Sequence, residues 1–203
     1  MLVKKMKIET YKHPDEQILW TGKPKKIVYI KEAILRPFLF VSLIWAAVSF
    51  GMFFGFFLGN NLEIPIYFLV PYCIIHLAPF WFYLIHVITS LIAWKHIEFM
   101  VTDKAVYTSY GVLRLYFDRK TFQEVTNVSV RQGIIDRHHN VGDVFIIAGR
   151  SSINFIDIED YMKVYQLVAK TSQDIFADTM YPNDLRPKEN HGYQTQYKPE
   201  DKK

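Results

Sequence analysis

The sequence predicts a membrane protein in which a two-helix transmembrane hairpin precedes a small antiparallel β-barrel or sandwich with a C-terminal capping helix. Three observations lead to this fold class. Apolar residues gather in two uncharged runs in the first half of the chain, short alternating segments with turn residues follow, and an apolar stripe at helical spacing comes last. Half of the 203 residues are hydrophobic and 16% are aromatic, which is rich for a soluble domain of this size.

Residues 1–35 form a polar lead, which we expect to be cytoplasmic. In this lead, the stretch DEQILWTGKPKKIVYI places a Gly-Lys-Pro turn between two short apolar runs. The sequence leaves two positions open for it: along the membrane surface with Trp20 as an interfacial anchor, or on the soluble unit. The opening MLVKKMKIET is too short and too charged for a cleavable signal with its own apolar region, so we expect an uncleaved anchor.

Two transmembrane helices are expected within residues 36–94. Residues 38–59, FLFVSLIWAAVSFGMFFGFFLG, carry no charge and match the roughly 20 apolar residues that cross a hydrocarbon core of about 30 Å. A second uncharged run follows, and we place its span at residues 66–88 with kinks at Pro71 and Pro79. The short polar link between the two runs is then the tip of a helical hairpin.

The distribution of basic residues orients this hairpin. Nine Lys or Arg residues accompany four acidic residues in the first 36 positions, whereas the remaining chain holds 15 basic and 16 acidic residues. Basic residues flank spans on the cytoplasmic side, so we expect a multi-pass protein of the bacterial cytoplasmic membrane with both termini in the cytoplasm. A basic block beside a bilayer is explained by topology and anionic lipid, and we therefore expect no nucleic-acid partner. The single cysteine, Cys73, excludes a disulfide within the chain.

Residues 95–178 predict the β-rich domain and its closing helix. HIEFMVTDKAVYTSYG, residues 96–111, alternates on both sides of a Thr-Asp-Lys turn and predicts a hairpin. Six or seven short strands in about 60 residues favour antiparallel hairpins in a sandwich or barrel. We expect the later strands in VLRLYF, FQEVTNVSVRQG, IIDRHHNVGDVFIIAG and SSINFIDI, with turns at residues 140–143 and 149–151.

An amphipathic helix is predicted over residues 158–176, with Asp157 as its N-cap. Its expected apolar stripe consists of Ile158, Tyr161, Met162, Tyr165, Leu167, Val168 and Ile175. Residues 179–203 have little apolar content and several structure breakers, so we expect a disordered tail.

Three segments in this order resemble the bacterial pleckstrin-homology-like family, a membrane-flanked domain once catalogued as a domain of unknown function. They are EQILWTGKP (16–24), FMVTDKAVYTSYGVL (99–113) and VTNVSVRQGIIDRHHNVGDVFI (125–146). The resemblance implies a seven-stranded, partly open barrel that a C-terminal helix caps, and it implies no catalytic residues. His138-His139-Asn140 departs from the family pattern, so these positions inherit no role from it.

The third segment also suggests a metal site, which we weigh against a plain turn. Asp136, His138 and Asp143 could converge if the chain turns near Asn140. Zinc, however, takes three or four ligands with nitrogen and sulfur preferred, and the one thiol lies in the second span. The turn therefore explains these residues better, and we expect no metal and no cofactor.

Within the predicted spans, two sets of residues are candidates for contact or function. Gly51, Gly55 and Gly59 form a GxxxGxxxG ladder that permits close helix packing, either on the second span or on a second copy of the protein. Cys73, His76 and His86 are polar groups at membrane depth, which are functional candidates by default.

The β-rich region offers a third set, for contact with lipid headgroups or a protein partner: Arg114, Arg119, Lys120, Arg131 and Arg137. Pleckstrin-like domains that bind phosphoinositides carry spaced basic residues in the first hairpin, whereas Lys104 stands alone here. We therefore rank a protein partner above a headgroup.

These observations predict a non-enzymatic scaffold or regulator of other membrane components. The expected partners are membrane lipids and other membrane proteins or further copies of the chain, and no small-molecule substrate is identified. A lipid-headgroup sensor is the alternative. A small transporter or metal-dependent membrane enzyme that uses the kinked second span ranks last, because no nucleophile with its base and no pair of carboxylates stands out.

Overall fold

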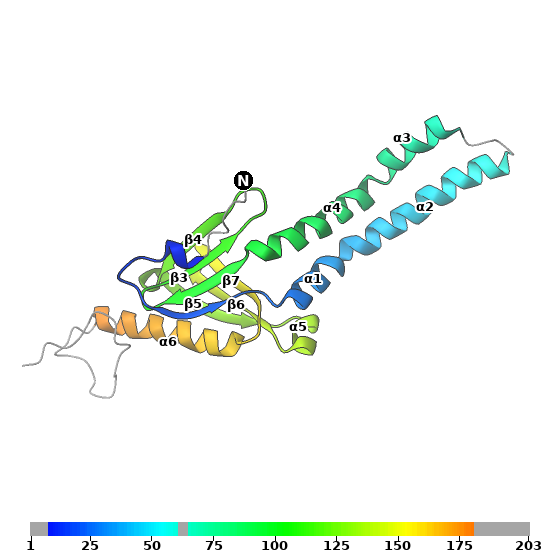
Figure 1. Ribbon diagram of the computed structural model, residues 1–203. Coiled ribbons are helices and arrows are strands. Elements are labelled where there is room, and N and C mark those ends of the chain that lie inside the picture. Colours follow the sequence, from blue (N-terminus) through cyan, green and yellow to red (C-terminus); the bar gives the residue numbers. More distant parts are fainter. Residues whose placement is uncertain (1–7, 61–64, 181–203) are drawn as a thin grey trace, which may run out of the picture. The chain divides into compact units, whose positions relative to one another are not determined.

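The computed structural model describes residues 8–60 and 65–180 (Figure 1). The chain divides into two compact units. The residues up to Val28 together with those from Ala93 onward form one, here called the sandwich unit, and Tyr29–Ile92 form the other, the helical unit. Of the tail predicted at 179–203, the first two residues belong to the last helix, and the rest lies outside the described residues.

The sandwich unit contains two antiparallel sheets, as the sequence predicts. The first sheet has the order β1 (Ile18–Gly22), β2 (Glu98–Thr102), β3 (Ala105–Tyr110) and β4 (Tyr116–Thr121). The second has the order β5 (Val125–Arg131), β6 (Gly142–Ala148) and β7 (Ser151–Ile158). Short 3-10 turns lie at Ile8–Tyr11 (η1), Trp94–His96 (η2) and Phe122–Glu124 (η3). The hairpin predicted at 96–111 is confirmed as β2 and β3.

Residues 8–28 of the lead belong to the sandwich unit, where Trp20 packs inside the fold and is not an interfacial anchor. The lead's strand β1 pairs antiparallel with β2, with Trp20 opposite Val101 and Gly22 opposite Phe99. The indole of Trp20 stacks on Phe155 of the second sheet, with 5.8 Å between ring centroids. The chain therefore leaves the first sheet after β1, forms the helical unit, and returns to the neighbouring strand β2.

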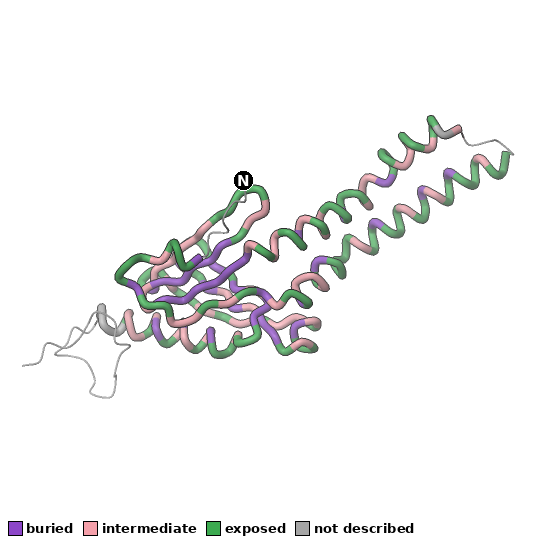
Figure 2. The backbone as a smooth tube through the Cα atoms, in the orientation of Figure 1, coloured by how far each residue is buried: buried purple, intermediate pink, exposed green. Residues whose placement is uncertain are grey.

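The core of the sandwich unit lies between the two sheets (Figure 2). Large side chains at 1% exposure or less come from both sheets, among them Phe99, Val106, Ile146 and Phe155. Phe99 and Phe155 stack across the core at 4.7 Å. Burial of such side chains is worth about 1.5–3 kcal/mol each, so these residues hold the two sheets together.

Helix α6 (Tyr161–Met180) packs on β5 and β6. The predicted start at residue 158 with Asp157 as N-cap is wrong, because both residues belong to β7 and Asp157 has a left-handed φ of 53°. The fully buried stripe is Val164, Val168 and Thr171, at helical spacing. Met162, which we expected in the stripe, is 47% exposed.

A short helix, α5 (Ile134–His139), replaces a predicted strand in IIDRHH. The Asp136 carboxylate accepts the Gly133 N–H at 2.7 Å and thereby caps the first turn. Asn140 ends the helix with a left-handed φ of 59°, a conformation that asparagine tolerates. His138 and His139 are thus neighbours on a helix, not on a strand.

The helical unit consists of most of α1 (Lys26–Ile34), α2 (Pro37–Gly59), α3 (Ile66–His76) and α4 (Ala78–Ala93). The segment Lys26–Gly59 is 34 residues long, and it is long and apolar enough to cross a membrane. The second apolar run is bent by 61° between α3 and α4, so the kink predicted near Pro79 is present as a break between two helices. The break at Leu77 falls just before Pro79, which sits in the first turn of α4, whereas Pro71 lies inside α3.

Candidate functional site

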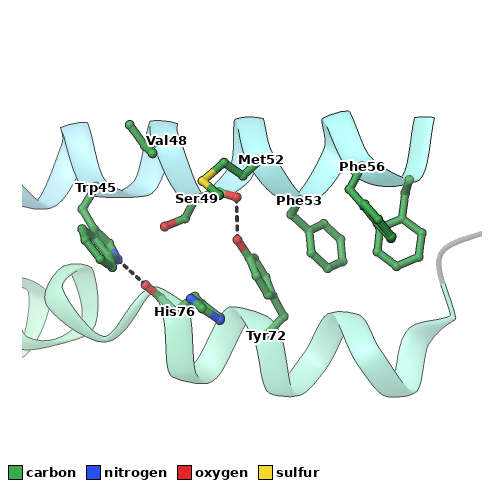
Figure 3. Close-up of a pocket in the computed structure, with 9 residues that line it drawn as sticks. Trp45, Val48, Ser49, Met52, Phe53, Phe56, Tyr72 and His76 are labelled. Carbon is green, nitrogen blue, oxygen red and sulfur yellow. Dashed lines mark hydrogen bonds between the residues drawn. The ribbon is translucent and has the colours of Figure 1, made fainter. Parts of the chain in front are cut away.

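Helices α2 and α3 line an open groove of about 480 Å³ (Figure 3). Its walls are mostly apolar and aromatic, with Trp45, Met52, Phe53 and Phe56 on α2 and Tyr72 and His76 on α3 among the lining residues. Figure 3 shows the Tyr72 and His76 rings between the two helices. The groove therefore suits an apolar chain or ring and offers few polar contacts.

Hydrogen bonds and stacked rings join the helices along this groove. The Trp45 indole N–H donates to the His76 carbonyl oxygen at 2.6 Å, and the Tyr72 hydroxyl donates to the Ser49 carbonyl oxygen at 2.5 Å. The Tyr72 ring packs on Phe53, with ring centroids 4.2 Å apart. Tyr83 of α4 makes a similar bond to the Ile34 carbonyl at 2.9 Å. Residues later in α1–α2 pair with residues earlier in α3–α4, since Ile34 pairs with Tyr83 but Ser49 pairs with Tyr72. The α1–α2 segment and the α3–α4 segment therefore run antiparallel.

The glycine ladder does not take part in this packing. A Cβ atom built at Gly51, Gly55 or Gly59 would meet no atom of the described residues outside its own helix turn within 4 Å. The α2 surface that contacts α3 carries Trp45, Ser49 and Phe53, one helical turn apart. Among the described residues the glycines make no close contact with the second apolar run, and packing on a second copy stays a prediction.

The structure does not connect the side chains of the three polar candidates in the helical unit. Cys73 and His76 accept indole N–H bonds from Trp81 and Trp45 through their backbone carbonyls. The His76 ring stacks on Tyr72 with centroids 4.4 Å apart. His86 lies on α4, beyond the break, and its Nε2 is buried without a hydrogen-bond partner within residues 8–60 and 65–180.

Arg119, one of the five basic candidates, is bound to the lead. Its guanidinium donates to the Glu16 carboxylate at 2.7 Å and to the Tyr107 hydroxyl at 2.8 Å. Thr102 and Tyr107 hydroxyls also donate to Glu16, whose side chain is 1% exposed. Burial alone raises the pKa of Glu16, but these hydrogen bonds outweigh burial and hold the pKa below its usual value of 4.5. Arg119 thus stabilises the fold.

The other basic candidates are spread over the sandwich unit. Arg114 lies in the β3–β4 loop, Lys120 follows Arg119 on β4, Arg131 ends β5, and Arg137 lies on α5. Consecutive residues of a strand point to opposite faces, so Lys120 and Arg119 do not share a surface. The five residues therefore lie on separate elements, and their contact with headgroups or a protein partner stays a prediction.

The loop between β3 and β4, residues 111–115, is an exposed apolar surface that sequence reasoning missed. Leu113 is 98% exposed and Leu115 is 44% exposed. Tyr110 and Tyr116 stack at the base of this loop, with centroids 5.4 Å apart. Gly111 has a φ of +124°, and a side chain there would overlap a carbonyl of the same loop, so glycine is required. The apolar stretch VLRLYF carried the signal, but we expected a strand over all of it.

The residues considered for a metal site each have another contact. Asp136 caps α5, and the Asp143 carboxylate accepts the Asp157 N–H at 2.9 Å. His138 packs edge-on against His139 and joins neither aspartate in a cluster with metal-ligand distances among the described residues. Burial raises the pKa of Asp143, and the charge of Asp136 acts in the same direction.

Comparisons with known proteins agree with this fold. Neither the curated proteins nor the solved structures contain a match to the chain. Residues 38–172 match the family model described as the bacterial PH domain, and this match includes α2 to α4 together with β2 to β7. The two sheets and the terminal helix are those that the family resemblance implied, with β1 supplied by the lead. The chain belongs to the bacterial PH domain family.

Proposed function

We propose that this chain is an integral membrane protein whose helical unit crosses the bilayer twice and whose sandwich unit faces the cytoplasm. The observation that carries the proposal is the pairing of β1 with β2. These strands are hydrogen-bonded neighbours in one sheet, yet the whole helical unit lies between them in the chain. Both ends of the helical unit therefore start from one folded unit on one side of the membrane. If α2 crosses, α3 and α4 must return.

Further features of the helical unit support two crossings. Its two segments run antiparallel, and α3 with α4 is together long and apolar enough to form one broken span. Many apolar side chains of these helices are exposed, including Ile44 at 65%, Met52 at 72% and Phe82 at 67%. Such a surface is stable in lipid and unfavourable in water. The Lys residues of the lead favour the cytoplasmic side of a bacterial cytoplasmic membrane for both ends.

Cysteine labelling tests this topology. In a Cys73→Ser background, a membrane-impermeant maleimide should label Asn60→Cys in intact spheroplasts, because Asn60 ends α2 at the far side. Arg150→Cys, in the exposed turn between β6 and β7, should react only after lysis. Labelling of both positions in intact spheroplasts, or of neither until lysis, would refute two crossings.

For the activity, we propose a non-enzymatic scaffold or regulator that contacts other membrane proteins through the β3–β4 loop. The exposed Leu113 and Leu115 with the flanking tyrosines support this surface, because apolar and aromatic side chains form the centres of protein interfaces. Arg119 is engaged with Glu16 and is not offered to a partner. A membrane-lipid sensor is the second candidate, since Arg114 and the same leucines also suit an anionic lipid surface. Transport or catalysis through His76 predicts that His76→Ala abolishes any associated phenotype.

Photo-crosslinking separates scaffold from sensor. A photoreactive amino acid replaces Leu113 in the full-length protein, and the matched control carries it at Ile134, which is 89% exposed on α5 of the same unit. Discrete protein adducts at position 113 but not at 134 support the scaffold. Adducts with lipid alone support the sensor, and equal adducts at both positions remove the loop from either function.

A further inference from the structure

Strand β7 forms an open edge of the second sheet. It is hydrogen-bonded to β6 on one side, and no strand of the described residues pairs with its other side. Among the described residues, the lead forms one backbone hydrogen bond with β7, from the Lys25 N–H to the Asp157 carbonyl oxygen at 2.8 Å near the end of the strand. Residues 152–156 are left without a neighbouring strand, and they are called the β7 edge below.

The pairing register shows which backbone groups point outward from the β7 edge. Ala148 and Ser151 close the two-residue turn between β6 and β7, so they form a hydrogen-bonded pair. Hydrogen-bonded and non-hydrogen-bonded pairs alternate along an antiparallel ladder. The N–H and C=O groups of Ser152 and Asn154 therefore point away from β6, and no hydrogen bond within the described part of the chain occupies them.

The β7 edge lacks the features that usually protect an edge strand. Charged side chains, prolines, bulges or a covering helix prevent unwanted pairing at most sheet edges. Residues 151–156 contain neither a charged residue nor a proline, and the bulge against β6 lies beyond Phe155. By contrast, β4 carries three charged residues and α6 packs on β5. The β7 edge is therefore suited to pairing with a further strand.

A groove of about 330 Å³ lies beside the β7 edge, within the sandwich unit. Residues of β7 form one wall, and residues of the first sheet form the other. Ile97 and Ile156 contribute apolar surface, whereas Thr108 and Asp118 contribute polar groups. Side chains of an extended segment alternate between two faces, so one face of such a segment can enter this groove while the other faces solvent.

Asp118 gives the groove a negative charge. It lies opposite Thr108 in the first sheet, is half-buried, and forms no ion pair among the described residues. The groove lining contains no Lys or Arg, so a basic side chain of an incoming segment would complement Asp118. Strand β7 of a second copy offers no such side chain, because residues 151–158 contain neither Lys nor Arg. The charge therefore favours a different protein.

We infer that the β7 edge binds an extended segment of a partner protein, which adds a fourth strand to the second sheet. The backbone of the segment pairs with the outward N–H and C=O groups of β7, and its alternate apolar side chains enter the groove. A Lys or Arg of the segment pairs with Asp118. The inference uses neither the leucines of the β3–β4 loop nor the membrane topology, so it goes beyond the proposed function and does not depend on it.

A phage-displayed library of random short linear peptides, selected on the full-length protein in detergent, tests the inference. Enriched peptides are synthesised, and their binding is measured by fluorescence anisotropy. We expect alternating apolar residues together with a Lys or Arg. N-methylation of every second peptide residue should abolish binding, whereas N-methylation of the intervening residues should not, because a strand bonds to each neighbour through alternate residues.

Variants of the protein locate the bound peptide. Asn154→Pro removes an outward N–H at an edge position, where proline is tolerated, and should weaken binding by at least about tenfold. Asp118→Asn should weaken binding of the basic peptide by about tenfold and leave binding of its Gln-substituted analogue unchanged. The matched control is Glu159→Gln, which removes an exposed acid elsewhere in the sandwich unit and should bind like wild type.

Four results would overturn the inference. The first is the absence of any enriched peptide with a Kd below about 1 mM, the weak limit of specific binding. The second is binding that N-methylation, Asn154→Pro and Asp118→Asn all leave unchanged. The third is loss of binding in Leu113→Ala, which would place the peptide on the β3–β4 loop. The fourth is a wild-type dimer that Asn154→Pro dissociates, which would make a second copy the occupant. If Asn154→Pro does not fold, the N-methylated peptides on wild-type protein give the same decision.

Discussion

Glu16 fastens the lead to the first sheet, and we expect Glu16→Ala to lower the melting temperature of the sandwich unit markedly. The Glu16 carboxylate accepts hydrogen bonds from Arg119 at 2.7 Å, from Thr102 at 2.7 Å and from Tyr107 at 3.0 Å. In the variant, the Thr102 and Tyr107 hydroxyls lose a charged acceptor and Arg119 loses its partner.

The size of the stability loss in Glu16→Ala depends on how exposed the former partners of Glu16 are. Removal of one partner from a buried ion pair destabilises by about 3–5 kcal/mol. Because the Arg119 side chain is 35% exposed, water rehydrates it in part. We therefore expect a loss of about 2–4 kcal/mol, which at roughly 2–4 °C per kcal/mol lowers Tm by about 4–16 °C.

Scanning fluorimetry of the full-length protein in detergent measures this change. The matched control is Asp15→Asn, which removes the adjacent acid and its ion pair with Lys104. Asp15 is 61% exposed, so its variant should melt close to wild type. Equal melting temperatures for Glu16→Ala and Asp15→Asn would refute the reasoning.

Acid provides a second check on Glu16. Because the folded-state pKa lies below the usual 4.5, the carboxylate stabilises the protein above about pH 4.5, and this stability is lost as the pH falls through the folded-state pKa. The difference in Tm between wild type and Glu16→Ala should therefore shrink in this acid range. A difference that is the same at pH 7 and pH 3 would contradict the assignment.

Three other predictions test separate parts of the molecule. Gly111→Ala should lower Tm, because its φ of +124° and the adjacent loop carbonyl exclude a side chain, whereas Gly55→Ala, with nothing within 4 Å, should not lower it. Tyr72→Phe should destabilise the helix pair by about 0.6–1.7 kcal/mol in an SDS unfolding titration, whereas Tyr67→Phe, at a position 70% exposed, should leave the midpoint unchanged. Burial raises the pKa of Asp143 above 3.8, so the folded state binds this proton more tightly and its stability falls as the pH rises from 3.8 through the raised pKa. In EDTA, Asp143→Asn should flatten that fall in a pH series of melting curves.

The sequence predicted those elements whose signals are local. Residues 96–111 place β-rich segments on both sides of a Thr-Asp-Lys turn, so their hairpin could be predicted without knowledge of any distant residue. IIDRHH was misassigned because two isoleucines before a polar run resemble a strand end. Its helical signals, the capping Asp136 and the left-handed Asn140, are single residues that only the observed geometry reveals.

Contacts between residues that are far apart in the sequence could not be predicted from local sequence patterns. The lead pairs with β2 across the whole helical unit, and Glu16 is separated from Arg119 by 103 positions. Arg119 therefore looked available for a ligand although it is internally bound. The face of α2 that packs on α3 carries Trp45, Ser49 and Phe53 and not the glycine ladder, because its partners on α3 lie far away in the sequence.

The insertion of the helices between β1 and β2 also orders events during synthesis. The ribosome releases β1 before any helix and β2 only after α4, so the first strand has no partner until the helices are complete. If the helices cross the membrane as proposed, a nascent chain that inserts α2 without returning would carry β2 to the wrong compartment. Its sheet could never close, and the unpaired strands would mark it for proteolysis. Correct membrane insertion thus becomes a precondition of folding, because the first sheet of the sandwich unit closes only when the helices have crossed twice.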